Sequence, residues 1–318
     1  MKIQGNTDVI WNTEKTPEAD KNMNVSGNKA VTKNGYSQTG VVYEKSSGTE
    51  VNYQTYNADG TVNVVSPASA TWSNQNIQTA LINLGFYSGQ PNGNLNSDLM
   101  RIAVSNFQRV YGLNQTGTMN QTTLSKLQLV DGFRNRAMNI LAENKNNTIV
   151  KDLVDSIERK NFANIWTFLR LGMGLGAMHA SAVMANIKAE SGFSSDNLHD
   201  ENGVVTHHDP DYVYNANDGK AYGILQWAEA SRKQGLLNQS KSMGLQPKDL
   251  NAQLAYFRTE MNSDMFCKSQ WAEFKNKKTL TDATEYFLND IEMPDKEEAR
   301  KKDRIMYANQ IYQLMYKL

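Results

Sequence analysis

The segment Ala180-Ser-Ala-Val-Met-Ala-Asn-Ile-Lys-Ala-Glu190-Ser-Gly-Phe193 joins the apolar stripe of a helix to a carboxylate. The stripe consists of Ala180, Val183, Met184 and Ile187. Glu190 follows Val183 by seven residues, so it continues the face that enters the core. An unpaired carboxylate against apolar neighbours resists ionising and keeps its proton near neutral pH. The segment predicts a buried helix that presents Glu190 as an acid; the alternative is that Glu190 turns outward at a frayed helix end.

The composition excludes several classes of protein. The chain has 318 residues, enough for two or three domains, with 33 Lys plus Arg balanced by 33 Asp plus Glu. This balance provides no basic field, so a nucleic-acid partner is not expected. Cys267 is the only cysteine, which rules out an internal disulfide and a thiolate zinc cluster.

Neither a signal peptide nor a membrane span is expected. Residues 1–8 lack the apolar run of a signal peptide, and no segment approaches the ~20 apolar residues of a spanning helix. We therefore expect a soluble chain without membrane insertion. If it acts outside the cytoplasm, a phage particle, a holin-type lesion or a dedicated export apparatus must deliver it.

Residues 1–68 have the composition of a flexible polar segment. They are rich in Asn, Thr, Ser, Lys and Gly without a helical apolar period. Within them, the β-prone runs Glu50–Tyr56 and Thr61–Val65 flank the turn signal Asn57-Ala-Asp-Gly60, which predicts a small β-hairpin.

Residues 69–130 alternate helical stripes with glycine turns, which predicts three short helices. Two turns have a similar sequence pattern with glycine in second place, Asn92-Gly-Asn-Leu95 and Thr116-Gly-Thr-Met119, as if one unit were used twice. Each turn needs a residue that tolerates positive φ. The stripes are Ile77, Leu81 and Leu84; Ile102, Ala103, Phe107 and Val110; and Leu124 and Leu127.

The same region resembles the three-helix peptidoglycan-binding domain of cell-wall hydrolases. The resemblance covers about 60 residues and implies a wall-binding role. Asn92 and Thr116 replace the acid that usually precedes each turn glycine in that family. The residues on which the resemblance rests are Leu81, Leu84-Gly-Phe-Tyr87, Asn92-Gly93, Ala103-Val-Ser-Asn-Phe-Gln108, Gly112-Leu113, Gly117, Thr122 and Leu124.

The rest of the chain is predicted to be mainly helical. Residues 131–160 indicate a helical connector interrupted at Asn144–Asn147, and residues 161–318 indicate a helical domain. The polar stretch from His199 to Lys220 is too irregular for a helix, so it predicts a loop or short β-region inside that domain.

The segment that begins at the end of this stretch offers the parts of a carbohydrate cleft: Asp218-Gly-Lys-Ala-Tyr222-Gly223-Ile-Leu-Gln226-Trp227. Gly223 permits close approach of backbone to a ligand, Gln226 supplies a donor and an acceptor, and Tyr222 and Trp227 supply rings for stacking, although buried aromatic residues are more often core.

Ala189-Glu-Ser-Gly-Phe193 and Ala221-Tyr-Gly-Ile-Leu-Gln-Trp227 together resemble the signatures of lysozyme-like muramidases and lytic transglycosylases, and most of all the phage-tail-type lysozyme domain. The resemblance spans about 155 residues and implies a mainly α, lysozyme-like (α+β) catalytic domain. Further marks are Asn164–Leu169, Ala230–Lys233, Asp249–Glu260, Asn289–Pro294, Arg300 and Tyr307.

The resemblance implies that Glu190 is the general acid, which protonates the glycosidic oxygen and then acts as a base. A hydrolase of the usual kind also needs a second carboxylate. Asp218 is the first candidate because it precedes the cleft-lining turn, although it also fits a solvated turn residue. The alternatives are Asp200, Glu201, Asp209 and Asp211. If none is placed for catalysis, the transglycosylase reaction is the better interpretation.

We expect neither a metal nor a cofactor. His199, His207, His208 and Asp209 lack the spacing of a zinc ligand set. His179 fits an ordinary packed or solvent-facing side chain, and Cys267, without a Cys-His-Asn context, fits an inert thiol.

The expected activity is cleavage of the MurNAc-GlcNAc β-1,4 bond of cell-wall peptidoglycan by an N-acetylmuramidase, a glycoside hydrolase; the alternative is a lytic transglycosylase that gives anhydro-muramyl products. The expected partner is the glycan strand, to which the binding domain tethers the enzyme, and a phage virion or cell-envelope assembly is a further candidate partner. The competing classes are a non-catalytic wall-binding structural component and an amidase or endopeptidase.

Overall fold

The computed structural model describes residues 72–153, 155–199, 211–264, 267–293 and 300–318 in full. Six strands between residues 7 and 65, residues 205–206 and residues 298–299 are described by their backbone. None of the helices in these ranges combines the length and the apolar composition needed to cross a bilayer.

The backbone of the N-terminal strands contains the predicted hairpin. β5 (Val51–Tyr56) pairs antiparallel with β6 (Val62–Val65), with Tyr56 opposite Val62. The sequence did not predict the neighbouring strands, β1 (Thr7–Trp11) and β4 (Gly40–Lys45), which complete an antiparallel sheet in the order β1-β4-β5-β6. A separate two-stranded ribbon is formed by β2 (Met23–Ser26) and β3 (Lys29–Thr32).

Three helices follow: α1 (Asn74–Asn83), α2 (Asp98–Val110) and α3 (Gln121–Glu143). Each begins after a polar side chain that accepts a hydrogen bond from a backbone N–H of the first turn. These capping residues are Ser73, Ser97 and Asn120. The third helix is not short as predicted, because it continues without a break to the Asn144 interruption. The proposed domain boundary at residues 130 and 131 therefore falls inside a helix.

One buried glutamine braces each of the two glycine turns. Gln78 of α1 accepts a hydrogen bond from Gly93 N at 2.7 Å and donates one to Asn92 Oδ1 at 3.1 Å. Gly93 and Gly117 both have positive φ, as predicted. The equivalent contacts of Gln108 in the second turn are Gly117 N at 2.9 Å and Thr116 Oγ1 at 3.0 Å.

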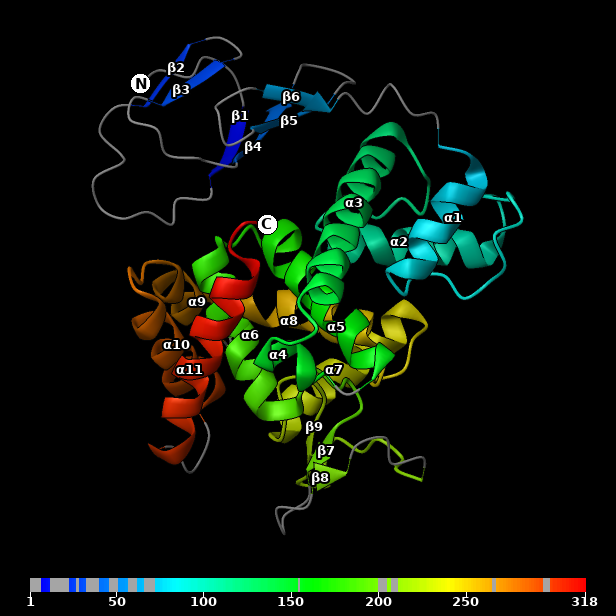
Figure 1. Cartoon of the computed structure of the whole chain (residues 1–318). Coiled ribbons are helices and arrows are strands. Elements are labelled where there is room, and N and C mark those ends of the chain that lie inside the picture. Colours follow the sequence, from blue (N-terminus) through cyan, green and yellow to red (C-terminus); the bar gives the residue numbers. More distant parts are fainter. Residues whose placement is uncertain are drawn as a thin grey trace.

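α6 (Ala177–Ser191) is the central helix of the C-terminal part (Figure 1). α10 (Leu280–Phe287) and α11 (Glu298–Met315) lie against it. The other elements are α4 (Thr148–Lys151), α5 (Ser156–Thr167), the π-helical turn η2 (Phe168–Gly172), α7 (Ala230–Met243), α8 (Leu250–Met261), α9 (Lys268–Lys275) and the π-helical turn η3 (Leu288–Glu292).

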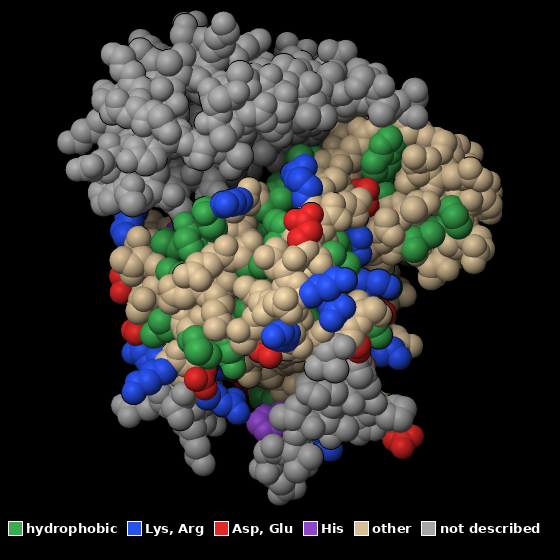
Figure 2. All heavy atoms as spheres, viewed as in Figure 1, with side chains coloured by type: hydrophobic (Ala, Val, Ile, Leu, Met, Phe, Trp, Pro, Cys, Tyr) green, Lys and Arg blue, Asp and Glu red, His purple; other side chains and the backbone are tan. Residues whose placement is uncertain are grey.

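The predicted irregular region contains a small antiparallel sheet in the order β8-β7-β9, at the bottom of Figure 1. Its strands are β7 (Leu198–His199), β8 (Val205–Thr206) and β9 (Ala221–Tyr222). On the face drawn in Figure 2, basic and acidic side chains are interspersed, in agreement with the balanced composition.

The three-helix unit packs directly on the C-terminal helices. The buried Asn106 of α2 donates a hydrogen bond to Met243 O, at the end of α7, at 3.0 Å. The buried Asn251 of α8 donates one to Leu84 O, at the end of α1, also at 3.0 Å. Because buried polar groups need such partners, these two bonds fix the unit against the helices that it touches.

Candidate active site

Glu190 lies in the last turn of α6, on the face that the sequence predicted to be buried. The four residues of the preceding stripe are fully buried, and the Glu190 side chain is only 12% exposed. This placement excludes the alternative in which Glu190 turns outward at a frayed helix end.

The end of α6 is fixed by the two residues after it. Gly192 and Phe193 both adopt left-handed backbone conformations, with φ of +59° and +73°. Phe193 is fully buried and packs edge-on against Phe162 of α5, with ring centroids 5.0 Å apart. Asn161, also on α5, donates a hydrogen bond to Phe193 O at 2.8 Å. The left-handed Gly192 ends the helix after Ser191, and the strained conformation of Phe193 that follows is held by its packing.

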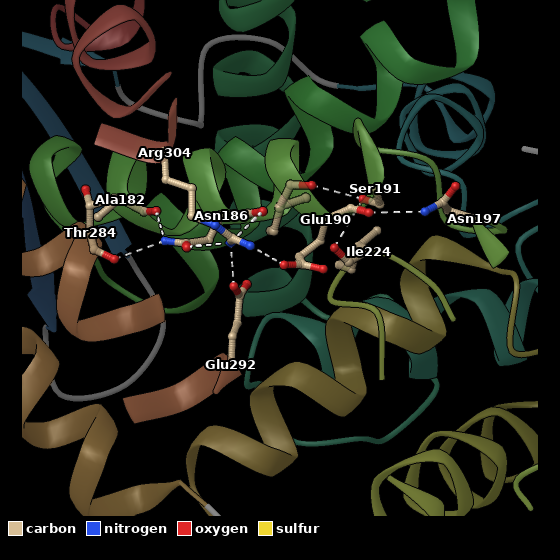
Figure 3. A network of polar contacts seen from close by, with 10 residues as sticks. Ala182, Asn186, Glu190, Ser191, Asn197, Ile224, Thr284, Glu292 and Arg304 are labelled. Atoms are coloured by element: carbon tan, nitrogen blue, oxygen red, sulfur yellow. Dashed lines mark hydrogen bonds and ion pairs between the residues drawn. The ribbon is translucent and has the colours of Figure 1, made fainter. Parts of the chain in front are cut away.

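Glu190 is not unpaired, contrary to the sequence prediction. Its Oε1 accepts a hydrogen bond from Arg304 Nη2 of α11, and the two groups form an ion pair (Figure 3). The side chain of Arg304 has no solvent exposure. The carboxylate is therefore buried with a cationic partner, instead of lying against apolar neighbours alone.

Arg304 also binds a second carboxylate and an amide. Its Nη1 donates to Glu292 Oε2, at the end of η3, at 2.7 Å and to Asn186 Oδ1 of α6 at 2.7 Å. Asn186 in turn donates to the backbone oxygens of Ala182 at 2.9 Å and Thr284 at 3.3 Å. This network joins α6, α10, η3 and α11 around the Glu190 side chain (Figure 3).

Glu292 is the acid with the most perturbed ionisation near this site. Burial raises the pKa of Glu292 to about 8, the negative charge of Glu190 adds to the rise, and the charges of Arg304 and, more weakly, Arg232 oppose it. Its Oε1 is buried and has no hydrogen-bond partner among the described residues. A protonated carboxyl is therefore the favoured form of Glu292 at neutral pH.

The turn from Tyr222 to Trp227 lies against the end of α6. Tyr222 N donates a hydrogen bond to Trp227 O at 3.1 Å, and Trp227 N donates one to Tyr222 O at 3.0 Å. Asn197 links the turn to the helix, because its Nδ2 donates to Glu190 O at 3.2 Å while its O accepts from Gly223 N at 2.9 Å. Ser191 Oγ lies 3.1 Å from Ile224 O and makes a second link.

Within this turn, Gly223 and Gln226 make contacts inside the protein. A Cβ atom at Gly223 would lie 2.8 Å from the Gln253 side chain, so the absence of a side chain serves internal packing. Gln226 has a φ of +48°, and its Nε2 donates to Gly223 O at 2.8 Å and to Asn197 O at 3.1 Å. The predicted approach of a ligand to Gly223 is therefore replaced by an approach of Gln253.

Trp227 is a core residue and offers no ring face for sugar stacking, which corrects the prediction. It is fully buried, and its Nε1 donates to Glu260 Oε2 of α8 at 3.1 Å. Glu260 is also buried and forms an ion pair with Arg232 at 2.6 Å. Tyr222 is 5% exposed, and its ring packs against Tyr212 and Tyr214.

Asp218 is engaged on both of its oxygens. Oδ1 accepts hydrogen bonds from Lys233 Nζ of α7 and from Lys220 N at 3.0 Å, and Oδ2 accepts one from Tyr212 OH at 2.7 Å. Burial by itself would raise the pKa of Asp218, but the hydrogen bonds from Lys233, Tyr212 and Lys220 outweigh burial and hold that pKa below its ordinary value. The Lys233 side chain is fully buried. Asp218 is thus the counter-ion of a buried lysine.

Most of the remaining candidates cannot be placed relative to the site. Asp200, Glu201, His207, His208 and Asp209 lie outside the described residues, and Asp211 is exposed. Among the described side chains, no group of three His, Cys, Asp or Glu is placed to hold a metal. The His179 ring lies edge-on to Phe274, in agreement with the packed alternative, and Cys267 is buried.

Three residues of the site were not predicted from the sequence: Arg304, Glu292 and Asn186. Asn186 lies four residues before Glu190, so helical spacing alone places both on one face. Arg304 and Glu292 are more than 100 residues further along the chain, and no spacing rule connects them to Glu190.

Comparisons with known proteins agree with this arrangement. Residues 160–315, which contain the whole network around Glu190, match the family model for phage tail lysozyme. Residues 74–127, which cover α1, α2 and the start of α3, match the model for the putative peptidoglycan binding domain. No curated protein and no solved structure matches the chain significantly.

Proposed function

We propose that this chain, whose phage tail lysozyme and peptidoglycan-binding domains indicate lysis of the bacterial cell wall, cleaves the β-1,4 bond between MurNAc and GlcNAc. Glu190 is the proposed general acid. The observation that carries this assignment is its position: it ends the central helix of the lysozyme domain, is 12% exposed, and is held by a buried arginine.

In the proposed reaction, Glu190 gives its proton to the glycosidic oxygen, so that the leaving group departs as a neutral alcohol while positive charge builds on the anomeric carbon. The carboxylate left behind faces Arg304, whose charge compensates the new negative charge. Glu190 then takes a proton from the attacking hydroxyl, which returns the site to its starting state.

Tyr222, Gly223, Gln226 and Trp227 have a supporting role in this proposal. Their turn is bonded to the end of α6 through Asn197 and Ser191, so it holds the backbone that carries Glu190. Substitutions in the turn are expected to act on the reaction by moving that backbone.

Two attacking groups are compatible with Glu190. In a muramidase the group is water, usually activated or assisted by a second carboxylate, for which Asp218 and the carboxylates of residues 200–211 are the candidates. In a lytic transglycosylase it is the 6-hydroxyl of the same sugar, which needs no second carboxylate and gives an anhydro-muramyl end. The ion pair between Asp218 and Lys233 favours this second reaction, because an Asp218 carboxylate bound to Lys233 is less able to assist an attacking water.

Digestion of purified sacculi followed by mass analysis tests both statements. We expect Glu190→Gln to abolish clearing while wall binding is retained, because the amide cannot donate a proton to the leaving group. The control is Glu273→Gln, which removes a half-exposed carboxylate on α9 and leaves clearing unchanged.

The products distinguish the reactions. Reducing MurNAc ends indicate hydrolysis, and anhydro-muramyl ends indicate the transglycosylase. New amino groups without new sugar ends would indicate an amidase or endopeptidase and contradict the proposal. Wall binding without any product from the unmodified protein would leave a non-catalytic wall-binding component.

A further inference from the structure

One buried guanidinium serves two carboxylates in the lysozyme domain. Arg304 binds Glu190 through Nη2 and Glu292 through Nη1, and the latter bond is 2.7 Å long. The side chains of Arg304 and Glu292 are 0% and 4% exposed. With both carboxylates ionised, the three groups would carry a net charge of −1 in a region shielded from water.

The cations on the surrounding elements form ion pairs with other acids. The pairs come from elements that pack around the three groups, and each cation is bound to a carboxylate of its own. Among the described residues they are Arg232 with Glu260 (α7 and α8), Lys188 with Asp152 (α6 and the end of α4), and Lys301 with Glu285 (α11 and α10). A proton is therefore the remaining means of neutralising the second carboxylate.

The geometry of Glu292 identifies where this proton rests. Its Oε2 is bound to Arg304, whereas its buried Oε1 lacks a hydrogen-bond partner among the described residues. An ionised carboxylate with an unpaired buried oxygen is much more costly than a neutral carboxyl in the same place. Glu292 also ends the π-helical turn η3, a type of element that often occurs at functional sites.

We propose that Glu292 is a positioning residue for the reaction: Glu190 and Glu292, bridged by Arg304, share one proton, and this shared proton is the one that Glu190 delivers. Arg304 supplies one positive charge to two carboxylates, so the three groups are neutral when one of the two carboxyls holds a proton. This inference rests on the proposed role of Glu190 as the acid.

The proton balance closes over one turnover. Delivery starts from the state in which Glu190 holds the proton and Glu292 is ionised; Glu190 gives the proton to the glycosidic oxygen, after which both carboxylates are ionised around Arg304. When Glu190 deprotonates water or the sugar 6-hydroxyl, the pair regains one proton. No metal, reductant or other co-reactant takes part in either step.

The first test is the pH profile of Glu292→Gln. With the second carboxylate gone, Arg304 and Glu190 form a simple ion pair, so we expect the basic limb of the profile to move down by about 1 to 3 pH units. Activity at neutral pH should fall at least about tenfold and recover on acidification. Glu285→Gln, which removes a partly exposed carboxylate of α10, should leave the limb in place. An unmoved limb in Glu292→Gln, or an equal loss at every pH, would overturn the proposal.

The second test needs no turnover and separates this inference from the proposed function. In protein labelled with 13C at the glutamate carboxyls, we expect one resonance to titrate near pH 8 and to be lost in Glu292→Gln. In Glu190→Gln this titration should move to lower pH, since the neighbouring charge is gone. If Glu190→Gln still clears sacculi, the proposed acid is wrong, whereas the titration continues to report on the shared proton. The inference fails if no carboxyl titrates above the ordinary range of glutamate, or if Glu190→Gln leaves the titration unchanged.

Discussion

Lys233 is a fully buried cation, and Asp218 is the carboxylate that neutralises it. Lys233→Met leaves Asp218 without its cation in a largely buried place, so we expect a loss of about 3–5 kcal/mol in the free energy of unfolding. Urea denaturation measures this loss. The double variant Lys233→Met, Asp218→Leu removes both charges and should lose clearly less than the sum of the two single variants. Additive losses would show that the two groups do not act as a pair.

The same pair predicts a pH dependence of stability. The pKa of Asp218 lies below its ordinary value in the folded protein, so its contribution is fully present above about pH 4, the ordinary aspartate value. As the pH falls from there through the lowered pKa, the contribution is lost. We expect the Tm difference between the unmodified protein and Asp218→Asn to shrink on going from pH 5 to pH 2. A difference that stays constant over this range would contradict the ion-pair assignment.

At the residue scale, the sequence predicted the burial of Glu190 but not its partner. Helical spacing is a local rule, and it correctly placed Glu190 behind Val183 and Ile187. The ion pair with Arg304 depends on how α11 packs on α6, a contact across 114 positions of the chain. Likewise, Trp227 had the right chemistry for a sugar platform, and only the surrounding helices show that its indole is enclosed.

The end of α6 can be tested with one substitution made at two places. Gly192 has a φ of +59° with no atom near a future Cβ, so Gly192→Ala should cost about 1–2 kcal/mol through backbone strain alone. Gly132 lies inside α3, also with open space, so Gly132→Ala should stabilise by up to about 1 kcal/mol. Thermal unfolding of both variants checks the opposite signs. A Gly192→Ala protein as stable as the unmodified one would mean that α6 does not need its left-handed end.

Elements with a regular apolar stripe were predicted well, and their hydrogen-bond irregularities were not. The stripes located α1, α2 and α6, and the polar stretch after His199 correctly indicated a short β-region. The π-helical turns η2 and η3 result from a shift in backbone hydrogen bonding that leaves no mark in composition. This matters for function because η3 ends at Glu292.

At the scale of the whole molecule, composition suggested a binding domain connected by a separate helical linker, and the packing differs. α3 starts in the peptidoglycan-binding domain and ends beyond it, while α2 lies against α8. Sequence stripes report that a face is buried, and they do not report which domain buries it.

This packing predicts that the peptidoglycan-binding and lysozyme domains unfold together. In calorimetry of the full chain we expect residues 72–318 to give one transition, because α3 is shared and buried hydrogen bonds cross the contact. Asn106→Ala leaves Met243 O buried without its partner, so it should lower the whole transition by about 1–3 kcal/mol. Asn309→Ala removes an exposed amide that also bonds a backbone oxygen, and should change stability by less than about 0.5 kcal/mol. The contrary result would be two transitions, of which Asn106→Ala shifts only one. That result would show that the wall-binding helices unfold independently and that their contact with α7 and α8 adds no cooperativity.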